Sequence, residues 1–143
     1  MTELDTAVAF FHACESAKGW DACREYAQPD ASFHSAAETY TGMASLAEYC
    51  DQIREAFTTT FVGSDYALVA AGYDAERRVA LLQAMSYAVH TGEGGPVPPT
   101  HKQAQIPFVY AIEFTPAGKI AHLEKIFDPG VSLRGLGWPD KTA

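Results

Sequence analysis

The sequence has few cysteines, few basic residues and no long apolar run. Cys14, Cys23 and Cys50 are an odd number of thiols without Cys-x-x-Cys spacing, so neither a disulfide framework nor a zinc knuckle is expected. Only 10 Lys and Arg stand against 18 Asp and Glu, which gives a formal charge of −8. Because a surface of this sign repels phosphate backbones and anionic lipid headgroups, we expect no nucleic-acid partner and no membrane partner.

The N-terminus lacks the features of a signal peptide. Glu3 and Asp5 stand where such a peptide carries Lys or Arg, and no apolar stretch approaches the roughly 20 residues that span a bilayer. Of the 143 residues, 48% are hydrophobic and 20% are charged, which is enough to bury a core. We therefore expect a cytoplasmic protein with a single domain, residues 1–143.

Hydrophobic periodicity divides the chain into a helical part and a strand-rich part. Helical spacing predicts helices over residues 5–18 and 21–26, and a third helix that Ser45 and Glu48 begin as a capping box. Strand-like spacing predicts strands over residues 31–36, 61–73, 77–91, 102–114 and 119–127. Helices first and long strands last indicate an α+β fold, with three N-terminal helices packed on a curved mixed or antiparallel sheet.

Short motifs in this order carry a family resemblance. They are His90-Thr91-Gly92, Pro98-Pro99-Thr100 with Lys102, Pro107, Gly118-Lys119-Ile120, Asp128 and Leu136-Gly137, preceded by Asp30, Phe33, His34 and Gly42. The chain resembles the nuclear-transport-factor-2-like (cystatin-like) superfamily, and within it the SnoaL-like polyketide and ester cyclases. The resemblance implies a cone-shaped half-barrel with an apolar pocket, which some members use for catalysis without a cofactor.

Candidate catalytic residues follow from the resemblance and from the strand pattern. In SnoaL-like and limonene epoxide hydrolase-like proteins an Asp often ends the last strand, which implies an acid or base role for Asp128. An apolar pocket raises the pKa of a carboxyl toward neutrality. His34 on the first strand can reach the mouth of the cone as a base or donor. The alternative for Asp128 is to cap the turn before Pro129 and Gly130.

The last strand can turn either of two faces to the pocket. Alternation places His122, Glu124 and Asp128 on one face and Leu123, Lys125 and Phe127 on the other. If the first face is inward, His122 and Glu124 join Asp128 in a row suited to proton transfer. If the second is inward, Lys125 is an isolated buried charge. Both faces are similarly apolar, so the pattern leaves the choice open.

Aromatic residues supply the candidate substrate contacts. Tyr40 and Tyr49 offer phenol donors, and Phe108, Tyr110 and Met85 lie on the long strands. The loop 92–101, rich in Gly and Pro, suits a flap over the pocket or a subunit contact. The two histidines that flank it lack a third ligand, so no metal is expected.

Together these features predict a small-molecule pocket protein. We expect a cofactor-independent acid–base enzyme, of the cyclase, isomerase or dehydratase type, acting on a small hydrophobic carbonyl compound. The alternative is a non-catalytic ligand-binding or dimerisation module with the same fold. The resemblance also implies a homodimer.

Overall fold

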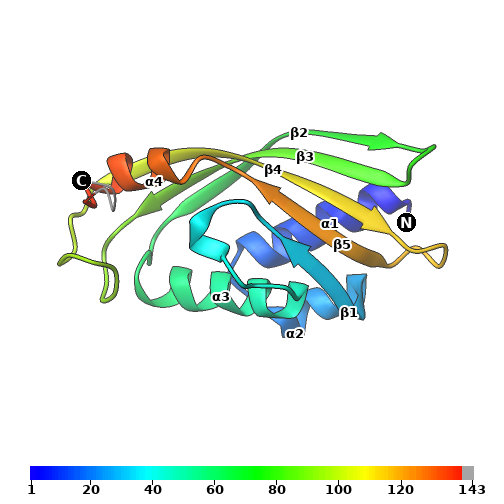
Figure 1. The fold of residues 1–143 in the computed structure, drawn as a ribbon, viewed down its shortest axis with the longest axis horizontal. Helices are drawn as coiled ribbons and strands as arrows, with labels where there is room; N and C mark the ends of the chain where they lie inside the picture. Colours follow the sequence, from blue (N-terminus) through cyan, green and yellow to red (C-terminus); the bar gives the residue numbers. More distant parts are fainter. Residues whose placement is uncertain (140–143) are drawn as a thin grey trace.

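The computed structural model describes residues 1–139. Its helices are α1 (Glu3–Glu15), α2 (Trp20–Cys23), α3 (Leu46–Thr59) and α4 (Pro129–Leu136), with short 3-10 helices η1 (Arg24–Tyr26) and η2 (Glu38–Tyr40). Its strands are β1 (Ala27–His34), β2 (Asp65–Asp74), β3 (Val79–Val89), β4 (Gln103–Phe114) and β5 (Ile120–Ile126). Figure 1 shows the long strands arching over α1 and α3.

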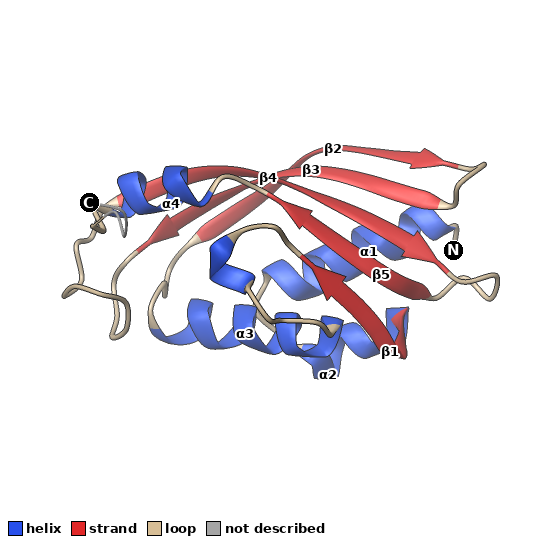
Figure 2. Cartoon of the chain, viewed as in Figure 1, coloured by secondary structure: helices blue, strands red, loops and turns tan. Residues whose placement is uncertain are grey.

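The five strands form one mixed sheet in the order β1-β5-β4-β3-β2. β2, β3, β4 and β5 pair as an antiparallel meander, and β1 pairs with β5 in parallel. Helices α1 and α3 lie on the same side of the sheet, as Figure 2 shows. The predicted α+β architecture, with N-terminal helices packed on a curved mixed sheet, is confirmed.

The helices begin at residues that satisfy their free N–H groups. Thr2 and Asp5 form a capping box at α1. At α3 the Ser45 hydroxyl accepts a hydrogen bond from the Glu48 N–H, which is the first half of the predicted capping box, while the Glu48 carboxylate accepts from the Ser45 hydroxyl. The predicted second helix is found as α2 followed by η1. The first strand covers Ala27–His34 rather than residues 31–36, and it can include Pro29 because β1 is an edge strand, where a missing N–H is tolerated.

Helix α4 was not predicted. Asp128 caps it by accepting a hydrogen bond from the Gly130 N–H at 2.8 Å, Pro129 occupies its first turn, and Gly137 ends it with φ of 72°. The sequence pattern suggested a turn at Pro129 and Gly130. Within the described residues, this helix packs against β4 at the end of the sheet where the Gly/Pro-rich loop lies.

The core lies between the sheet and the N-terminal helices. Phe10 and Phe11 of α1, Tyr49 of α3, and Leu82 and Ile112 of the sheet are fully buried there. The core thus fills the space under the middle of the sheet. Beyond it, toward α4, the side chains do not close the space completely, and a cavity remains.

The loop 92–101 has no regular structure, as predicted, and packs against the C-terminal end of α3. A Cβ on Gly92 would lie 1.8 Å from the Thr59 carbonyl oxygen, and one on Gly95 would lie 2.7 Å from the Trp138 ring. Only glycine permits these two approaches. In the described part of the chain, no helix is long and apolar enough to cross a membrane.

Candidate functional site

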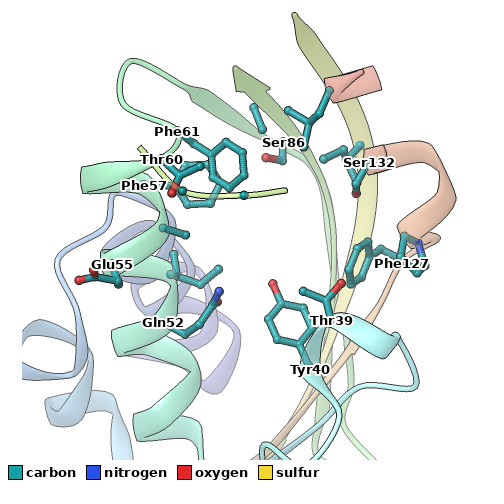
Figure 3. Close-up of a pocket in the computed structure, with 18 of the residues that line it drawn as sticks. Thr39, Tyr40, Gln52, Glu55, Phe57, Thr60, Phe61, Ser86, Phe127 and Ser132 are labelled. Atoms are coloured by element: carbon teal, nitrogen blue, oxygen red, sulfur yellow. The ribbon is translucent and has the colours of Figure 1, made fainter. Parts of the chain in front are cut away.

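A cavity of about 760 Å³ opens between α3, the inner face of the sheet and α4. Figure 3 shows Phe57 and Phe61 on one side and Phe127 on the other, while Gln52 of α3 and Tyr40 of η2 point toward one another across the space. Most of the wall surface is apolar, and polar side chains from α3, η2 and the sheet are spread between the apolar groups. This volume and lining are typical of a site for one small hydrophobic molecule.

Lys125 brings a positive charge into this apolar space. The inner face of β5 consists of Leu123 and Lys125, and Lys125 is only 8% exposed. Its Nζ donates hydrogen bonds to the hydroxyls of Tyr49 at 2.9 Å and Tyr40 at 3.2 Å. Four aromatic rings surround the ammonium at 5.0–5.1 Å, those of Tyr40, Tyr49, Phe108 and Phe127. These contacts stabilise the charged form of the lysine in place of water.

Two hydrogen-bond donors at this end of the cavity have no acceptor within residues 1–139. An ammonium carries three N–H groups, and Lys125 uses two of them on tyrosine hydroxyls. The Tyr40 hydroxyl accepts from Lys125, and its own O–H remains available. Both residues line the cavity. A ligand oxygen beside them can therefore accept two hydrogen bonds, one of them from a full positive charge.

A chain of hydroxyl groups connects Lys125 with Glu15 of α1. The Tyr49 and Tyr110 hydroxyls share a hydrogen bond of 2.5 Å, and Tyr110 donates to Glu15 Oε1 at 2.6 Å. Burial and then the charge of Glu15 raise the pKa of both tyrosines well above the ordinary value, so the phenols stay neutral. The two tyrosine hydroxyls thus separate the Lys125 ammonium from the Glu15 carboxylate, and their hydrogen bonds hold both groups in place.

Glu15 is the acidic group that faces this positive end. It lines the cavity, and only one of its carboxylate oxygens is bonded to Tyr110. Burial raises the pKa of the Glu15 carboxyl, and the charge of Lys125 and the Tyr110 hydrogen bond oppose this shift. A carboxylate of raised pKa in an apolar cavity is a stronger base than one in water, which suits proton abstraction.

Gln52 adds a polar group without a partner. Its Oε1 is buried and accepts no hydrogen bond from the described residues, and its side chain lies on the cavity wall opposite Tyr40. A buried acceptor without a donor costs about 1–3 kcal/mol. A ligand with a hydroxyl or amide N–H at that position would remove this cost.

The predicted substrate contacts are divided between the cavity and its surroundings. Tyr40 and Phe108 line the cavity. Tyr49 and Tyr110 are fully buried, do not line the cavity, and form hydrogen bonds with Lys125 and Glu15, respectively. Met85 alternates with the buried residues of β3, faces away from the cavity and is not part of its lining. Phe108 of β4 therefore lies on the cavity wall, whereas Met85 of β3 lies outside it.

The predicted catalytic residues of β1 and β5 lie together on the outer face of the sheet. Parallel pairing places Ser32 beside His122 and His34 beside Glu124. His34 Nδ1 lies 2.7 Å from a Glu124 oxygen, and the Ser32 hydroxyl lies 2.7 Å from His122 Nδ1. None of these residues lines the cavity, and the His34 side chain is 63% exposed. Their catalytic role remains a prediction, and the inward face of β5 is the one that carries Lys125.

Asp128 also lies outside the cavity lining, although Phe127 and Pro129 on either side of it contribute to the wall. Its carboxylate is exposed and caps α4, which agrees with the alternative interpretation that Asp128 is a capping residue before Pro129 and Gly130. The acid–base role of Asp128 likewise remains a prediction. The cavity contains other groups for that role, Glu15 and Lys125.

The sequence reasoning missed Glu15 and Gln52. Glu15 lies four residues after Phe11, on the same face of α1 as the buried Phe11, so helical spacing could have indicated a carboxylate facing the core. Gln52 lies three residues after Tyr49 and four before Ala56, both of which face the interior of the fold. A polar residue at an inward helical position is the signal in both cases.

No protein-family model matches the sequence, and no curated protein matches it. Solved structures do match. IdmH of Streptomyces antibioticus, a proposed polyketide cyclase, has a TM-score of 0.76 at 20% identity, over 96% of this chain and 99% of its own. A proposed SnoaL-like polyketide cyclase from Jannaschia has a TM-score of 0.75 at 16% identity, over 96% and 93%. An LEH-like epoxide hydrolase from M. tuberculosis has a TM-score of 0.66 at 15% identity, over 94% and 88%.

These similarities establish the fold. The chain has the NTF2-like, cystatin-like fold that the SnoaL-like polyketide cyclases share, as its sequence resemblance implied. Proteins of this fold differ in the chemistry that their pockets perform. The activity of this chain therefore has to be argued from its own cavity.

Proposed function

We propose that the protein is a cofactor-independent enzyme that moves a proton next to the carbonyl group of a small hydrophobic molecule, as cyclases and isomerases do. The observation that supports this proposal is the pairing, in one apolar cavity, of a buried ammonium on Lys125 with a carboxylate of raised pKa on Glu15. A carbonyl compound needs a positive donor at its oxygen and a base near its α-carbon, and the cavity contains both.

In this mechanism the carbonyl oxygen accepts hydrogen bonds from the free N–H of Lys125 and the O–H of Tyr40. The Glu15 carboxylate removes a proton from the α-carbon, the C–H electrons form the enolate double bond, and negative charge develops on the oxygen. The ammonium stabilises that charge more strongly than it stabilises the neutral carbonyl, which lowers the barrier. Glu15 then returns the proton to the original carbon or to another one. Alternatively, the enolate carbon attacks a second carbonyl group, whose C=O π bond breaks, and its oxygen takes the proton from Glu15.

The experiment measures this elementary step with a probe. Cyclic ketones such as 2-tetralone exchange their α-hydrogens for deuterium in D₂O, and NMR follows the exchange. We expect the protein to accelerate the exchange and the Glu15→Gln variant to lose about 10²–10⁴-fold of that acceleration, the usual contribution of a general base. Glu76→Gln serves as the matched control, because Glu76 is exposed and does not line the cavity.

Two outcomes would contradict the proposal. If no ketone of a panel that fits the cavity exchanges faster than in buffer, the protein is a binding module, which is the alternative function for this fold. If exchange is accelerated equally by the wild-type protein and by the Glu15→Gln variant, the base is another group. Acceleration that depends on Glu15 but not on Glu76 supports the proposal.

We also propose that the protein is a cytoplasmic homodimer that pairs through the outer face of its sheet. Leu81 and Ile126 are more than half exposed although they are large and apolar, and both belong to the central strands of the sheet. Sedimentation velocity of the wild-type protein and a Leu81→Glu variant tests the pairing. A monomeric wild-type protein would contradict it.

A further inference from the structure

The three cysteines of the chain meet at one point. Cys14, Cys23 and Cys50 come from α1, α2 and α3, and their Sγ atoms all lie within 4.8 Å of one another. Each thiol is free and completely buried. Within residues 1–139 they are the one group of three possible metal-binding side chains that lie this close together. Spacings of 9 and 27 residues gave no indication of this cluster.

Local structure holds the short helix α2 against α3. The Trp20 N–H donates to Asp51 Oδ1 at 2.9 Å, which fixes the start of α2 beside the residue that follows Cys50. Gly19 has φ of 76°, and a Cβ there would lie 2.9 Å from the Arg54 side chain and 3.0 Å from Asp51. This close approach places Cys23, at the end of α2, over the gap between the two longer helices.

We propose that these three thiols form a binding site for a soft trivalent ion, with arsenous acid as the representative ligand, held by Cys14, Cys23 and Cys50. Thiolates are the preferred ligands of soft ions. A pyramidal ion with three thiolate bonds of about 2.3 Å holds its sulfur atoms about 3.3–3.5 Å apart. The three Sγ atoms already lie within 4.8 Å of one another, so they have to approach by at most about 1.5 Å to reach that geometry.

The charge around the cluster favours a trivalent ion. A complex of three thiolates has a net charge of −2 with a monovalent ion and −1 with a divalent ion, and it is neutral with a trivalent ion. Glu15 and Asp51 follow Cys14 and Cys50 directly in the sequence, and their negative charges act against thiolates in this cluster. Because further negative charge in a buried site is costly, the neutral complex is the favoured one.

The binding reaction is balanced without an oxidant or reductant. Three S–H bonds and three As–OH bonds break, three As–S bonds form, and three water molecules leave, so arsenic keeps its oxidation state and no net proton is released. Access requires α2 to open, and this helix has only four residues and no side-chain cap.

The test is titration of the reduced protein with arsenous acid, followed by mass spectrometry under non-denaturing conditions. We expect one arsenic per chain, with a mass that corresponds to the loss of three water molecules from the two reactants. The same titration in urea is the control for general thiol reactivity. Equal affinity in urea, or a complex that has lost only two water molecules, would overturn the proposal.

Variants assign the ligands. We expect Cys23→Ala to weaken binding by at least about 10- to 100-fold, since even the loss of an outer-shell partner costs that much at metal sites. Arg24→Gln, on the neighbouring exposed residue, keeps all three thiols and should bind as the wild type does. Unchanged affinity in Cys23→Ala would overturn the proposal, and so would tighter binding of Zn²⁺ than of arsenous acid in the wild type.

Thermal unfolding provides a second readout for variants that fold poorly. A ligand that binds only the folded protein raises its unfolding temperature by mass action. Arsenous acid should therefore raise the unfolding temperature of the wild type and of Arg24→Gln, but not that of Cys23→Ser. If arsenous acid stabilises all three proteins equally, the thiol cluster is not its site.

Discussion

Glu124 and Lys125 are neighbours on β5, yet the fold puts them in opposite surroundings. Glu124 lies on the outer face beside His34, and both side chains are partly exposed to solvent. Lys125 lies on the inner face among aromatic rings, and its charge is opposed by Glu15 through two tyrosines. Both faces therefore have an acid and a base, in direct contact on the outer face and connected through two tyrosine hydroxyls on the inner face. Only on the inner face do these groups border a cavity that can hold a substrate.

The difference between the two faces lies in how much water screens the charges. An ion pair in water contributes about 0–1 kcal/mol, because solvent and salt weaken the attraction and the side chains lose freedom. In an apolar cavity the same charges act over longer distances on whatever molecule enters. The following predictions test this contrast, from the largest expected effect to the smallest.

Among the hydrogen-bond donors of the cavity, replacing Lys125 by Met should have the largest effect on activity. Removal of one donor from a site that stabilises an oxyanion costs about 10²–10³-fold in rate, and we expect a loss of this size in the α-hydrogen exchange assay. Met fits among aromatic rings, but the buried Glu15 carboxylate then loses the positive charge that opposes it, so the free energy of unfolding should fall at neutral pH. Denaturation in urea measures this second quantity.

Lys18→Met is the matched control for this prediction, because Lys18 is exposed beyond the end of α1. A Lys125→Met variant that keeps full activity would show that the inner face does not act through its charge. A variant that loses activity only because it unfolds would be recognised in the urea experiment.

Replacing Tyr40 by Phe should have a smaller effect on the same reaction. The change removes one neutral hydroxyl donor, and neutral hydrogen bonds contribute about 0.5–1.5 kcal/mol. This corresponds to a loss of about 2- to 13-fold in exchange rate at 25 °C. The ring remains beside Lys125, so the cation–π contact is kept. A loss as large as that of Lys125→Met would mean that the hydroxyl has a second role, such as proton transfer.

Glu15 should make the folded protein less stable as the pH rises. Burial raises the pKa of Glu15 above its ordinary value of 4.5, while Lys125 opposes the shift. Above pH 4.5 the folded state therefore keeps a proton that the unfolded state has lost. Because the folded state binds more protons, its stability falls as the pH increases through the raised pKa. The midpoint of urea unfolding, measured from pH 4 to pH 8, checks this direction.

The Glu15→Gln variant separates this contribution from those of the other titrating groups. Its amide does not ionise, so the part of the stability loss that comes from Glu15 should disappear and the midpoint at pH 7 should increase. An unchanged pH profile would show that Glu15 is solvated in the folded state. Lys125→Met should steepen the loss, since the positive charge that lowers the pKa of Glu15 is then absent.

Features that depend on neighbouring residues were predicted from the sequence better than features that depend on contacts between residues far apart in the chain. The cap at Ser45 and the long strands follow from patterns within a few residues, and both were found. The inward face of β5 could not be chosen, because its two faces are equally apolar and the parallel pairing with β1 depends on residues about 90 positions away. Helix α4 could have been predicted from Asp128, Pro129 and Gly137, which are a cap, a first-turn proline and a C-terminal glycine.

The site itself depends on contacts that no spacing encodes. Lys125, Tyr110 and Glu15 belong to three elements, and they meet only after the sheet has curved over α1. The same holds for the three cysteines, whose helices approach one another without a common period. For Glu15 and Gln52, the signal in the sequence was a polar residue at an inward helical position.

The smallest expected effect concerns the outer face. Glu124→Gln removes the charge partner of His34, and an exposed pair of this kind contributes no more than about 1 kcal/mol to the free energy of unfolding. The contribution should shrink further in high salt, which screens exposed charges. If the outer residues His34, His122 and Glu124 were instead the catalytic group that the sequence suggested, the same variant would abolish α-hydrogen exchange while Lys125→Met would leave it intact. Measuring both variants in one assay therefore decides which face of β5 performs the chemistry, because each face predicts loss in one variant and retention in the other.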